Sequence, residues 1–456
     1  MTTMTSPSPV SPVSAAPAPP VAAPAGASIA PPPRRLNAGR WLVWSLYALL
    51  LVAAPLLFKS SLSLTMLSQA GYLVIICLSY NILLGQGGML SFGHAVYAGL
   101  GSFLAIHAMN AAASGRFYIP LSLIPLVGGL AGLFFAALLG YVTTKKAGTT
   151  FAMITLGVGE LVFAMSLMFP EFFGGEGGIT TNRAYGTPFL GITFGPQIQV
   201  YYLIALYCFV CTAAMFAFTR TPLGRMLNAV RDNPERVEFI GYDTQRVRYY
   251  AFIIAGFFAG IGGGLAAINA EIVTAEVVSS VRSGSLLLFT FLGGATFFFG
   301  PIIGAALLVL ALVLLSELSM AWLLYVGLVF LFMVMYAPGG LASLIMVNLR
   351  VASFGKLGRL LPAYGALVLT ALAALLGGAA MVEMLYHLQL NAAVGPELKF
   401  MGLVLDATRT VTWLGAGVLL FIGLVLFALA RQHFAAQWGR VQDEIEAETR
   451  RREELL

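Results

Sequence analysis

The chain has 456 residues, of which 59% are hydrophobic and 10% are charged, and its formal net charge is +6. A soluble globular domain is usually about one-quarter charged, so this composition excludes that class of protein. The apolar residues lie in runs of about 20, the length that a helix needs to cross about 30 Å of hydrocarbon. We therefore predict an all-α, polytopic helical membrane protein.

Residues 1–40 form the first predicted region, a cytoplasmic N-terminus. Residues 1–33 consist mostly of Pro, Ala, Ser and Thr, a composition that cannot bury a core, so we predict disorder. Arg34, Arg35 and Arg40 then precede the first apolar run. Because Lys and Arg are enriched in cytoplasmic segments beside membrane spans, they indicate that the N-terminus stays in the cytoplasm.

Twelve predicted spans follow. Their bounds are 41–58, 64–84, 90–110, 119–143, 150–169, 198–219, 248–270, 285–299, 301–317, 320–345, 361–386 and 411–430. With the N-terminus inside, strict alternation of the spans puts Lys145, Lys146 and the segment 220–248 in the cytoplasm, and it puts 170–197 outside. The even number of spans leaves the C-terminus in the cytoplasm as well.

One part of this pattern is ambiguous. Residues 276–317 are consistent either with two short spans or with a broken, partly re-entrant pair. The residues that leave both possibilities open are the helix breakers Gly293, Gly294, Gly300 and Pro301.

The three cysteines all fall inside apolar runs. Cys208 and Cys211 form a C-x-x-C pair, which in a soluble protein could suggest a redox or zinc site. No further ligand lies near them in the sequence, so we interpret them, with Cys77, as small packing residues. The sequence predicts no metal site.

Residues 220–248 differ from the rest of the chain, because ten of the 44 charged residues lie there. Helix-start signals, each a capping residue before a proline, occur at Thr221–Pro222 and again at 232–234. Gly241 offers a helix stop, and Asp243–Thr244 begins a helix that continues into the membrane. The pattern predicts short helices between two spans.

Such short helices would form a rigid protrusion, and a protrusion of this kind can dock into a cleft on a soluble partner. Its exposed face should carry Arg231, Glu235 and Glu238, with Val237 and Ile240 on another side. The alternative is an ordinary solvated loop between two spans.

Six stretches, taken together, carry a resemblance to one family. They are LLGQGGMLSFGHAVYAGLGSFLA (83–105), TFAMITLGVGELVF (150–163), FGGEGGI (173–179), the stretch from TPLGR to GGGLAA (221–267), FLGGATFFFGPIIGAALL (291–308) and YAPGGLASLI (336–345). In this order they resemble the M-type permease of bacterial branched-chain amino-acid ABC importers. The same group includes similar permeases for urea and for short amides.

The resemblance covers about residues 41–347 and implies a permease transmembrane domain of about ten spans. Two features depart from the family pattern. Thr296 stands where the family usually has glycine, and the chain continues beyond the family's usual end. Residues 348–430 add two further spans, and 431–456 form a charged helical tail that we expect in the cytoplasm.

The resemblance also implies a role and partners. The chain is expected to form the path for small polar or zwitterionic solutes, with branched-chain amino acids first and urea or amides as alternatives. The implied partners are a second homologous permease, two ATP-binding cassette subunits, a periplasmic binding protein and membrane lipid, without nucleic acid. The implied location is the bacterial inner (plasma) membrane.

The energy source can be examined in the sequence directly. No G-x-x-x-x-G-K-[S/T] motif occurs, so we expect no enzyme activity and no cofactor in this chain, with ATP used by the partner subunits. The alternative is an ion-coupled secondary transporter, which usually buries several ionisable groups in its spans. Only Glu160, Glu383, His94 and His107 are candidates here. An intramembrane enzyme or scaffold has less support.

Two sets of candidate site residues follow from the motifs and the resemblance. The residues expected to couple the chain to an ATPase are Gly224, Arg225, Arg231, Asp232, Asn233, Glu235 and Gly241. The residues expected in gating or in the solute path are Gly85, Gln86, Gly87, Gly88, Ser91, His94 and Glu160.

A purely structural role remains an alternative for the residues of the second set. The glycines could form a plain interhelical turn. His94 is favoured as a packed, hydrogen-bonded histidine over a solute contact. Glu160 is expected to be buried in mid-span, where it either makes a structural hydrogen bond or lines the path.

Overall fold

The computed structural model describes residues 38–116, 119–184, 193–390, 395, 397–400 and 403–454. The chain divides into two compact units, residues 1–47 and 48–456, and the second contains nearly all of the described elements. Residues 1–37, which include the stretch 1–33 predicted to be disordered, lie outside the described residues. The predicted N-terminal region 1–40 extends three residues too far, because α1 begins at Ala38.

The described elements are almost all helices, which run along the chain as follows. The α-helices are α1 (Ala38–Leu57), α2 (Ser61–Asn81), α3 (His94–Ala113), α4 (Ile124–Thr143), α5 (Gly148–Met168), α6 (Pro170–Phe173), α7 (Gln197–Phe218), α8 (Pro222–Asp232), α9 (Pro234–Phe239), α10 (Thr244–Ala270), α11 (Ser280–Gly293), α12 (Gly300–Leu310), α13 (Ser316–Leu318), α14 (Trp322–Tyr336), α15 (Gly340–Ser353), α16 (Leu357–Leu390) and α17 (Thr410–Glu454). Two π-helical turns, η1 (Ile82–Gln86) and η5 (Ala311–Leu315), continue α2 and α12.

The predicted fold class is confirmed. Among the described residues, nine helices are long and apolar enough to cross a membrane, or ten if the bent pair α14 and α15 counts as one span. Two of the twelve predicted spans are shorter than that. The apolar part of α1 covers only Trp41–Leu57, and α11, at the position of the predicted span 285–299, has 14 residues.

The ambiguous region 276–317 contains a short helix, a break and a longer helix. α11 ends at Gly293, and Gly294 has a φ of +114°, which L-residues with a side chain rarely adopt. The next helical segment, Gly300–Leu318, has 19 residues and is long enough to span. The predicted bounds 285–299 were therefore wrong, because the helix begins at Ser280 and ends at Gly293.

The predicted span 320–345 is a bent pair of helices, which is either one broken span or a re-entrant loop. Its two helices, α14 and α15, are bent by 50° at a break around residue 338. Pro338 has no backbone N–H, and its ring disfavours the helical region for Ala337, which has φ −140° and ψ 66°. The break between α14 and α15 contacts the break after α11, since a Cβ on Gly340 would collide with Gly294.

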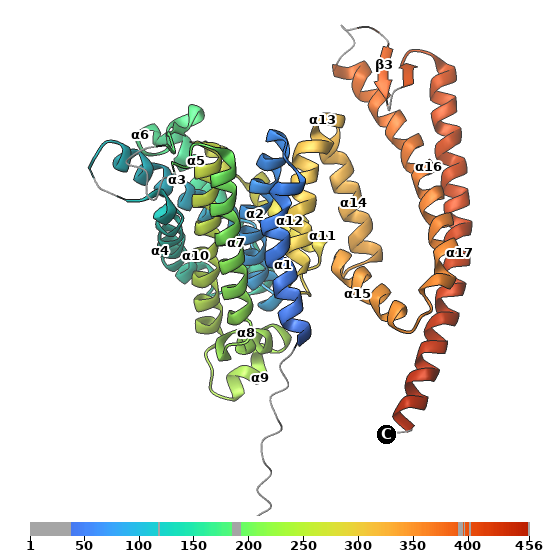
Figure 1. Cartoon of the computed structure of the whole chain (residues 1–456), viewed down its shortest axis with the longest axis horizontal. Coiled ribbons are helices and arrows are strands. Elements are labelled where there is room, and N and C mark those ends of the chain that lie inside the picture. Colours follow the sequence, from blue (N-terminus) through green and yellow to red (C-terminus); the bar gives the residue numbers. More distant parts are fainter. Residues whose placement is uncertain are drawn as a thin grey trace, which may run out of the picture. The chain divides into compact units, whose positions relative to one another are not determined.

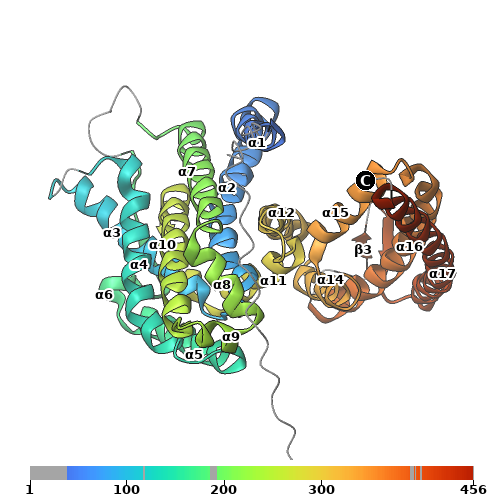
Figure 2. The same ribbon diagram turned by 90° about the horizontal axis from the view of Figure 1, so that it is seen from below.

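Glycines allow three helices, α3, α4 and α10, to pack closely together. Figure 1 and Figure 2 show α3, α4 and α10 side by side, and α10 is the most buried of the span-length helices among the described residues. A Cβ on Gly260 of α10 would collide with the carbonyl of Gly128 on α4, and one on Gly101 of α3 would collide with Gly260. Small residues allow this approach, which is the usual way that helices associate in lipid.

Two short antiparallel strand pairs lie outside the helices. β1 (Ile179–Thr180), in the predicted exterior loop 170–197, pairs with β2 (Ile272–Val273), which follows α10. Residues 185–192 of that loop lie outside the described residues. β3 (Glu397–Phe400) pairs antiparallel with β4 (Leu403–Asp406) between α16 and α17.

The C-terminal helices form a pair of their own. α17 joins the predicted span 411–430 and the predicted helical tail in one helix of 45 residues. Near its end, Glu444 forms ion pairs of 3.0 Å with Lys356 and 3.2 Å with Arg359. At the other end of α16, Glu383 accepts hydrogen bonds from Ser319 and from Tyr325. These contacts join the pair to the rest of the chain.

The glycine contacts predict a clear difference between two substitutions. Gly260→Ala should lower the thermal unfolding temperature of the detergent-purified chain, because the added methyl group forces α10 away from α4. Overpacking of this kind costs about 1–3 kcal/mol. Gly327→Ala is the matched control, since a Cβ there meets nothing within 4 Å. Equal unfolding temperatures for the two variants would contradict the glycine-mediated packing.

Candidate functional site

The charged segment 220–248 folds into two short helices with the predicted caps. The Thr221 hydroxyl accepts a hydrogen bond from the backbone N–H of Gly224 at 3.2 Å, which starts α8. The Asn233 side chain accepts one from the N–H of Arg236 at 3.0 Å, which starts α9. Asp243 caps α10 in the same way. The prediction of short capped helices is confirmed.

Gly241 ends α9 as predicted, and its geometry explains why glycine is needed. Its φ is +88°, in the left-handed region. Its N–H donates to the carbonyl of Glu238 at 2.9 Å, and the N–H of Tyr242 donates to the carbonyl of Val237 at 3.2 Å. These two bonds form a Schellman motif, which satisfies the last carbonyls of the helix and turns the chain sharply.

The side chains of α8 and α9 divide into an inner and an outer set. Arg231, Glu235 and Glu238 are exposed, as predicted, and Val237 is buried. Ile240 was predicted on the same side as Val237, but it is 66% exposed, and Phe239 beside it is 89% exposed. The end of α9 therefore presents large apolar side chains to its surroundings.

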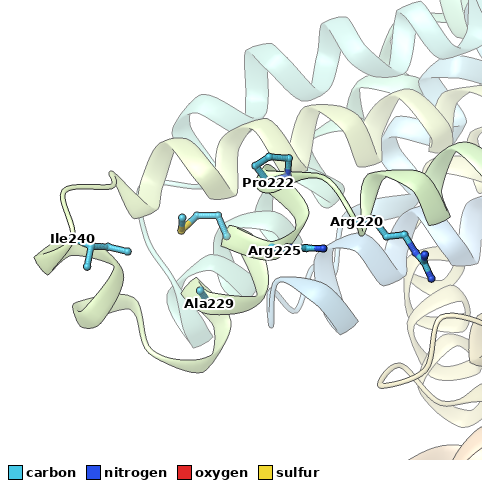
Figure 3. Close-up of a pocket in the computed structure, with 6 residues that line it drawn as sticks. Arg220, Pro222, Arg225, Ala229 and Ile240 are labelled. Atoms are coloured by element: carbon cyan, nitrogen blue, oxygen red, sulfur yellow. The ribbon is translucent and has the colours of Figure 1, made fainter. Parts of the chain in front are cut away.

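A groove of about 430 Å³ runs along α8. Figure 3 shows its lining, with Ile240 at one end and Arg220 at the other. The full lining consists of Arg220, Pro222, Arg225, Met226, Ala229 and Ile240. The guanidinium of Arg220 lies 4.4 Å from the centre of the Phe216 ring. The groove is thus apolar at one end and basic at the other. Of its lining residues, only Arg225 is among the site residues predicted from the sequence.

One side of α8 contacts the predicted gating segment. A guanidinium nitrogen of Arg231 donates to the carbonyl of Gly85 at 2.5 Å, and the Asn228 amide donates to the Gln86 side chain at 2.9 Å. Arg231 also pairs with the neighbouring Asp232 at 2.9 Å. The structure therefore brings together two sets of residues that the sequence predicted separately. Nothing in the local sequence pattern signals the contact.

Three glycines shape the segment beside α8. Gly85 lies in the π-helical turn η1, where a Cβ would collide with the carbonyl of Ala295 in the break between α11 and α12. Gly88 has a φ of +62°, and a Cβ there would lie 2.7 Å from the Arg231 side chain. A Cβ on Gly87 would lie 2.8 Å from the carbonyl of Leu83. Larger residues at these positions would displace the segment from its neighbours.

Ser91 and His94 lie in a fully buried polar cluster. The Tyr80 hydroxyl donates to the carbonyl of Ser91 at 2.8 Å, and the His94 Nε2 atom lies 2.9 Å from the Ser79 hydroxyl. The rings of Tyr80 and His94 meet edge to face, with centroids 4.9 Å apart. His94 is therefore packed and hydrogen bonded, as the sequence favoured, and it does not face an open path in this structure.

Glu160 does not lie where the sequence predicted. It was expected to be buried, but it is exposed on the surface of α5 and forms no hydrogen bond or ion pair with any described residue. The reason is that α5 lies at the edge of the bundle, with one-third of its span buried. Hydropathy fixes the depth of a residue in the membrane but not the direction in which its side chain points.

No metal site is found among the described residues, where no group of three or more His, Cys, Asp and Glu side chains could hold an ion. Cys77, Cys208 and Cys211 are buried as free thiols in α2 and α7. Their positions agree with the interpretation as packing residues.

Gly241 provides a test of the turn that aims α9. Gly241→Val should loosen α9, because a β-branched residue in the left-handed region is strained by about 1–2 kcal/mol. Gly241→Asn should have a smaller effect, since asparagine visits this region. Hydrogen exchange of residues 234–243 is the measurement, and it should quicken in the valine variant. Equal exchange in wild type and both variants would show that the turn does not depend on glycine.

Comparison with known proteins gives one family match and several relatives. The family model described as "Branched-chain amino acid transport system / permease component" matches residues 62–338, more than half of the chain. The chain is 27% identical over 330 residues to the high-affinity branched-chain amino acid transport system permease protein LivM of Salmonella typhimurium, covering 68% of this chain and 76% of that protein.

Two further relatives show the breadth of the similarity. The LivM protein of Escherichia coli is 26% identical over 299 residues, covering 61% of this chain and 69% of that protein. The fructose import permease protein FrcC of Rhizobium meliloti is 23% identical over 218 residues, covering 44% of this chain and 58% of that protein. No solved structure matches the chain.

Proposed function

Because the chain belongs to the family of permease components of branched-chain amino-acid transport systems, we propose that it is the membrane-spanning permease subunit of an ATP-driven importer. It forms the path for a small polar or zwitterionic solute, with branched-chain amino acids as the first candidate. A periplasmic binding protein delivers the solute, and separate subunits hydrolyse ATP. The chain itself is not an enzyme and uses no cofactor.

The shape of the segment 220–248 is the observation that carries this proposal. α8 and α9 are short, capped helices held by spans on both sides, and their free surface combines exposed Phe239 and Ile240 with the basic end of the groove. Exposed aromatic and apolar side chains rimmed by charge are typical of protein interfaces. A soluble ATPase with a complementary cleft fits this surface. A solvated loop would not need three caps and a Schellman turn.

The solute is proposed from the relatives rather than from a binding pocket. Two relatives are named as branched-chain amino-acid permeases, whereas the fructose permease shows that a similar chain serves a different solute. Urea and short amides therefore remain alternatives in the proposal. Selection of the solute would lie mainly with the binding protein, since the permease then needs only a path of low affinity.

The assembly and its orientation complete the proposal. The importer contains this chain, a homologous second permease, two ATP-binding cassette subunits and the periplasmic binding protein, in the lipid of the bacterial inner membrane. Both termini and the segment 220–248 face the cytoplasm, and the β1–β2 pair faces the periplasm. This orientation places α8 and α9 on the side where ATP is available.

Reconstitution in proteoliposomes tests the proposed energy source. We expect uptake of leucine only when the full assembly, the binding protein and internal ATP are present together. The control is this chain reconstituted alone with a pH or sodium gradient, which should show no uptake. Uptake by the chain alone on such a gradient would refute the proposal and favour an ion-coupled secondary transporter.

Charge reversals test the proposed docking surface. Arg225→Glu and Glu235→Arg should each reduce co-purification of the ATPase and leucine uptake, because both residues are exposed on α8 and α9. A desolvated interfacial pair typically loses about 3–5 kcal/mol when one partner is removed, and an exposed pair under about 1 kcal/mol.

The control for these reversals is Lys146→Glu, which changes an exposed charge in the turn between α4 and α5, proposed to lie on the same side of the membrane. It should leave both measurements unchanged. Normal co-purification and uptake in both reversals would mean that the segment is only a solvated loop.

A further inference from the structure

The exposed face of α5 contains a carboxylate in the middle of a membrane span. The residues of α5 that are exposed along its length are Gly148, Thr149, Thr150, Met153, Gly157, Glu160, Leu161, Ala164, Met165, Leu167 and Met168. Glu160 lies 12 residues after the start of the helix at Gly148, which corresponds to about 18 Å. It is therefore about half-way through a hydrocarbon core of about 30 Å.

The neighbouring helix α4 shows what a lipid-facing surface of this chain looks like. Its exposed residues are large and apolar, and they include Leu126, Leu130, Leu133, Phe134 and Leu138. In the middle of α5, by contrast, the exposed residues are Gly157, Glu160 and Ala164, with one large apolar residue, Leu161, beside them. A Cβ on Gly157 would meet nothing within 4 Å, so this glycine is not explained by packing inside the chain.

A charged side chain in hydrocarbon is costly, and such residues usually face water or another protein. No described residue of this chain pairs with Glu160, so none of the described elements supplies a counterpart for its charge. The small residues around it leave room for that counterpart. The face of α5 is thus suited to a water-filled passage rather than to lipid.

The same turn of α5 is anchored on its inner side to the segment that meets α8. The N–H of Phe92 donates to the Thr155 hydroxyl at 3.1 Å, and a Cβ on Gly93 would collide with the Thr155 carbonyl. Gly159, the residue before Glu160, lies against Gly93. The segment 85–93 therefore contacts α8 at one end and α5 at the other, within nine residues.

We propose that Glu160 lies on the solute path and binds the ammonium group of a zwitterionic solute as it passes. This inference rests on the proposed function and adds the residue that contacts the solute. One carboxylate at mid-depth attracts the ammonium end without holding the whole solute tightly, as a path of low affinity requires. Movement of α8 reaches Glu160 through the contacts of 85–93.

Cysteine labelling tests the path without depending on transport. Gly157→Cys places a thiol one helical turn from Glu160, and the native thiols Cys77, Cys208 and Cys211 are buried. In the full assembly in proteoliposomes, we expect this thiol to react with cationic 2-aminoethyl and with neutral 2-hydroxyethyl methanethiosulfonate. The cationic reagent should be favoured about threefold, the size expected for unit charges about 6 Å apart in water.

Adding Glu160→Gln to Gly157→Cys should abolish the preference for the cationic reagent. Labelling is measured by mass spectrometry, and the wild-type chain gives the background level. An unchanged preference would show that Glu160 does not act on a cation at this face. Absence of reaction with both reagents would show that the face is sealed by lipid or protein. Either result would overturn the proposal.

Transport measurements then test the ammonium contact itself. Glu160→Gln should lower leucine uptake about tenfold, since a hydrogen bond to a charged group is lost, and it should raise the ATP hydrolysed per leucine taken up. Glu160→Asp should restore part of the uptake. Glu317→Gln, at another exposed acid near the end of a span, should behave as wild type.

These experiments distinguish a failure of the proposed function from a failure of the proposed role of Glu160. A wild-type assembly that imports leucine without ATP would contradict the proposed function, whatever Glu160 does. A wild-type assembly that couples ATP to uptake, with a wild-type ratio in the Glu160→Gln variant, would overturn the role of Glu160 alone. The amount of each variant in the membrane is measured beside its activity.

Discussion

The close approach of α10 to its neighbours is the constraint on which the rest of the structure depends. Lipid provides no hydrophobic force between helices, so these helices must gain their stability from packing at short range. Gly260 and Gly128 remove the side chains that would separate α10 from α4, and Gly263 does the same towards Ala98 on α3. Because α10 begins directly after the turn at Gly241, the same helix that fixes the bundle also fixes the position of α8 and α9.

The segment 85–93 makes several parts of the bundle dependent on one another. It contacts α8 through Gly85 and Gln86, the break after α11 through Gly85, and α5 through Gly93. The break after α11 in turn meets the break between α14 and α15 at Gly294 and Gly340. Irregular backbone at membrane depth is tolerated where protein surrounds it, which describes these sites. The regular helices are thus held together by glycine contacts, and the irregular turns lie where one helix contacts another.

The sequence predicted those features that depend on neighbouring residues. Caps at Thr221, Asn233 and Asp243 act over two or three residues, so they could be read directly, and hydropathy located most spans. The break near residue 338 was missed because the apolar run continues through it, although Pro338 was a usable signal. The contact of Arg231 with Gly85 and the exposure of Glu160 depend on how distant helices pack. No local pattern contains that information.

The length of α17 has a mechanical consequence. The helix has 45 residues without a break, and the part beyond Ala430 extends about 36 Å. A helix that tilts to match the thickness of its bilayer tilts as a whole, so a change of about 10° would carry Glu444, about 21 Å beyond Ala430, through about 4 Å. Glu444 forms ion pairs with Lys356 and Arg359. A change in bilayer thickness that tilted α17 would therefore exert a sideways force on the junction of α15 and α16.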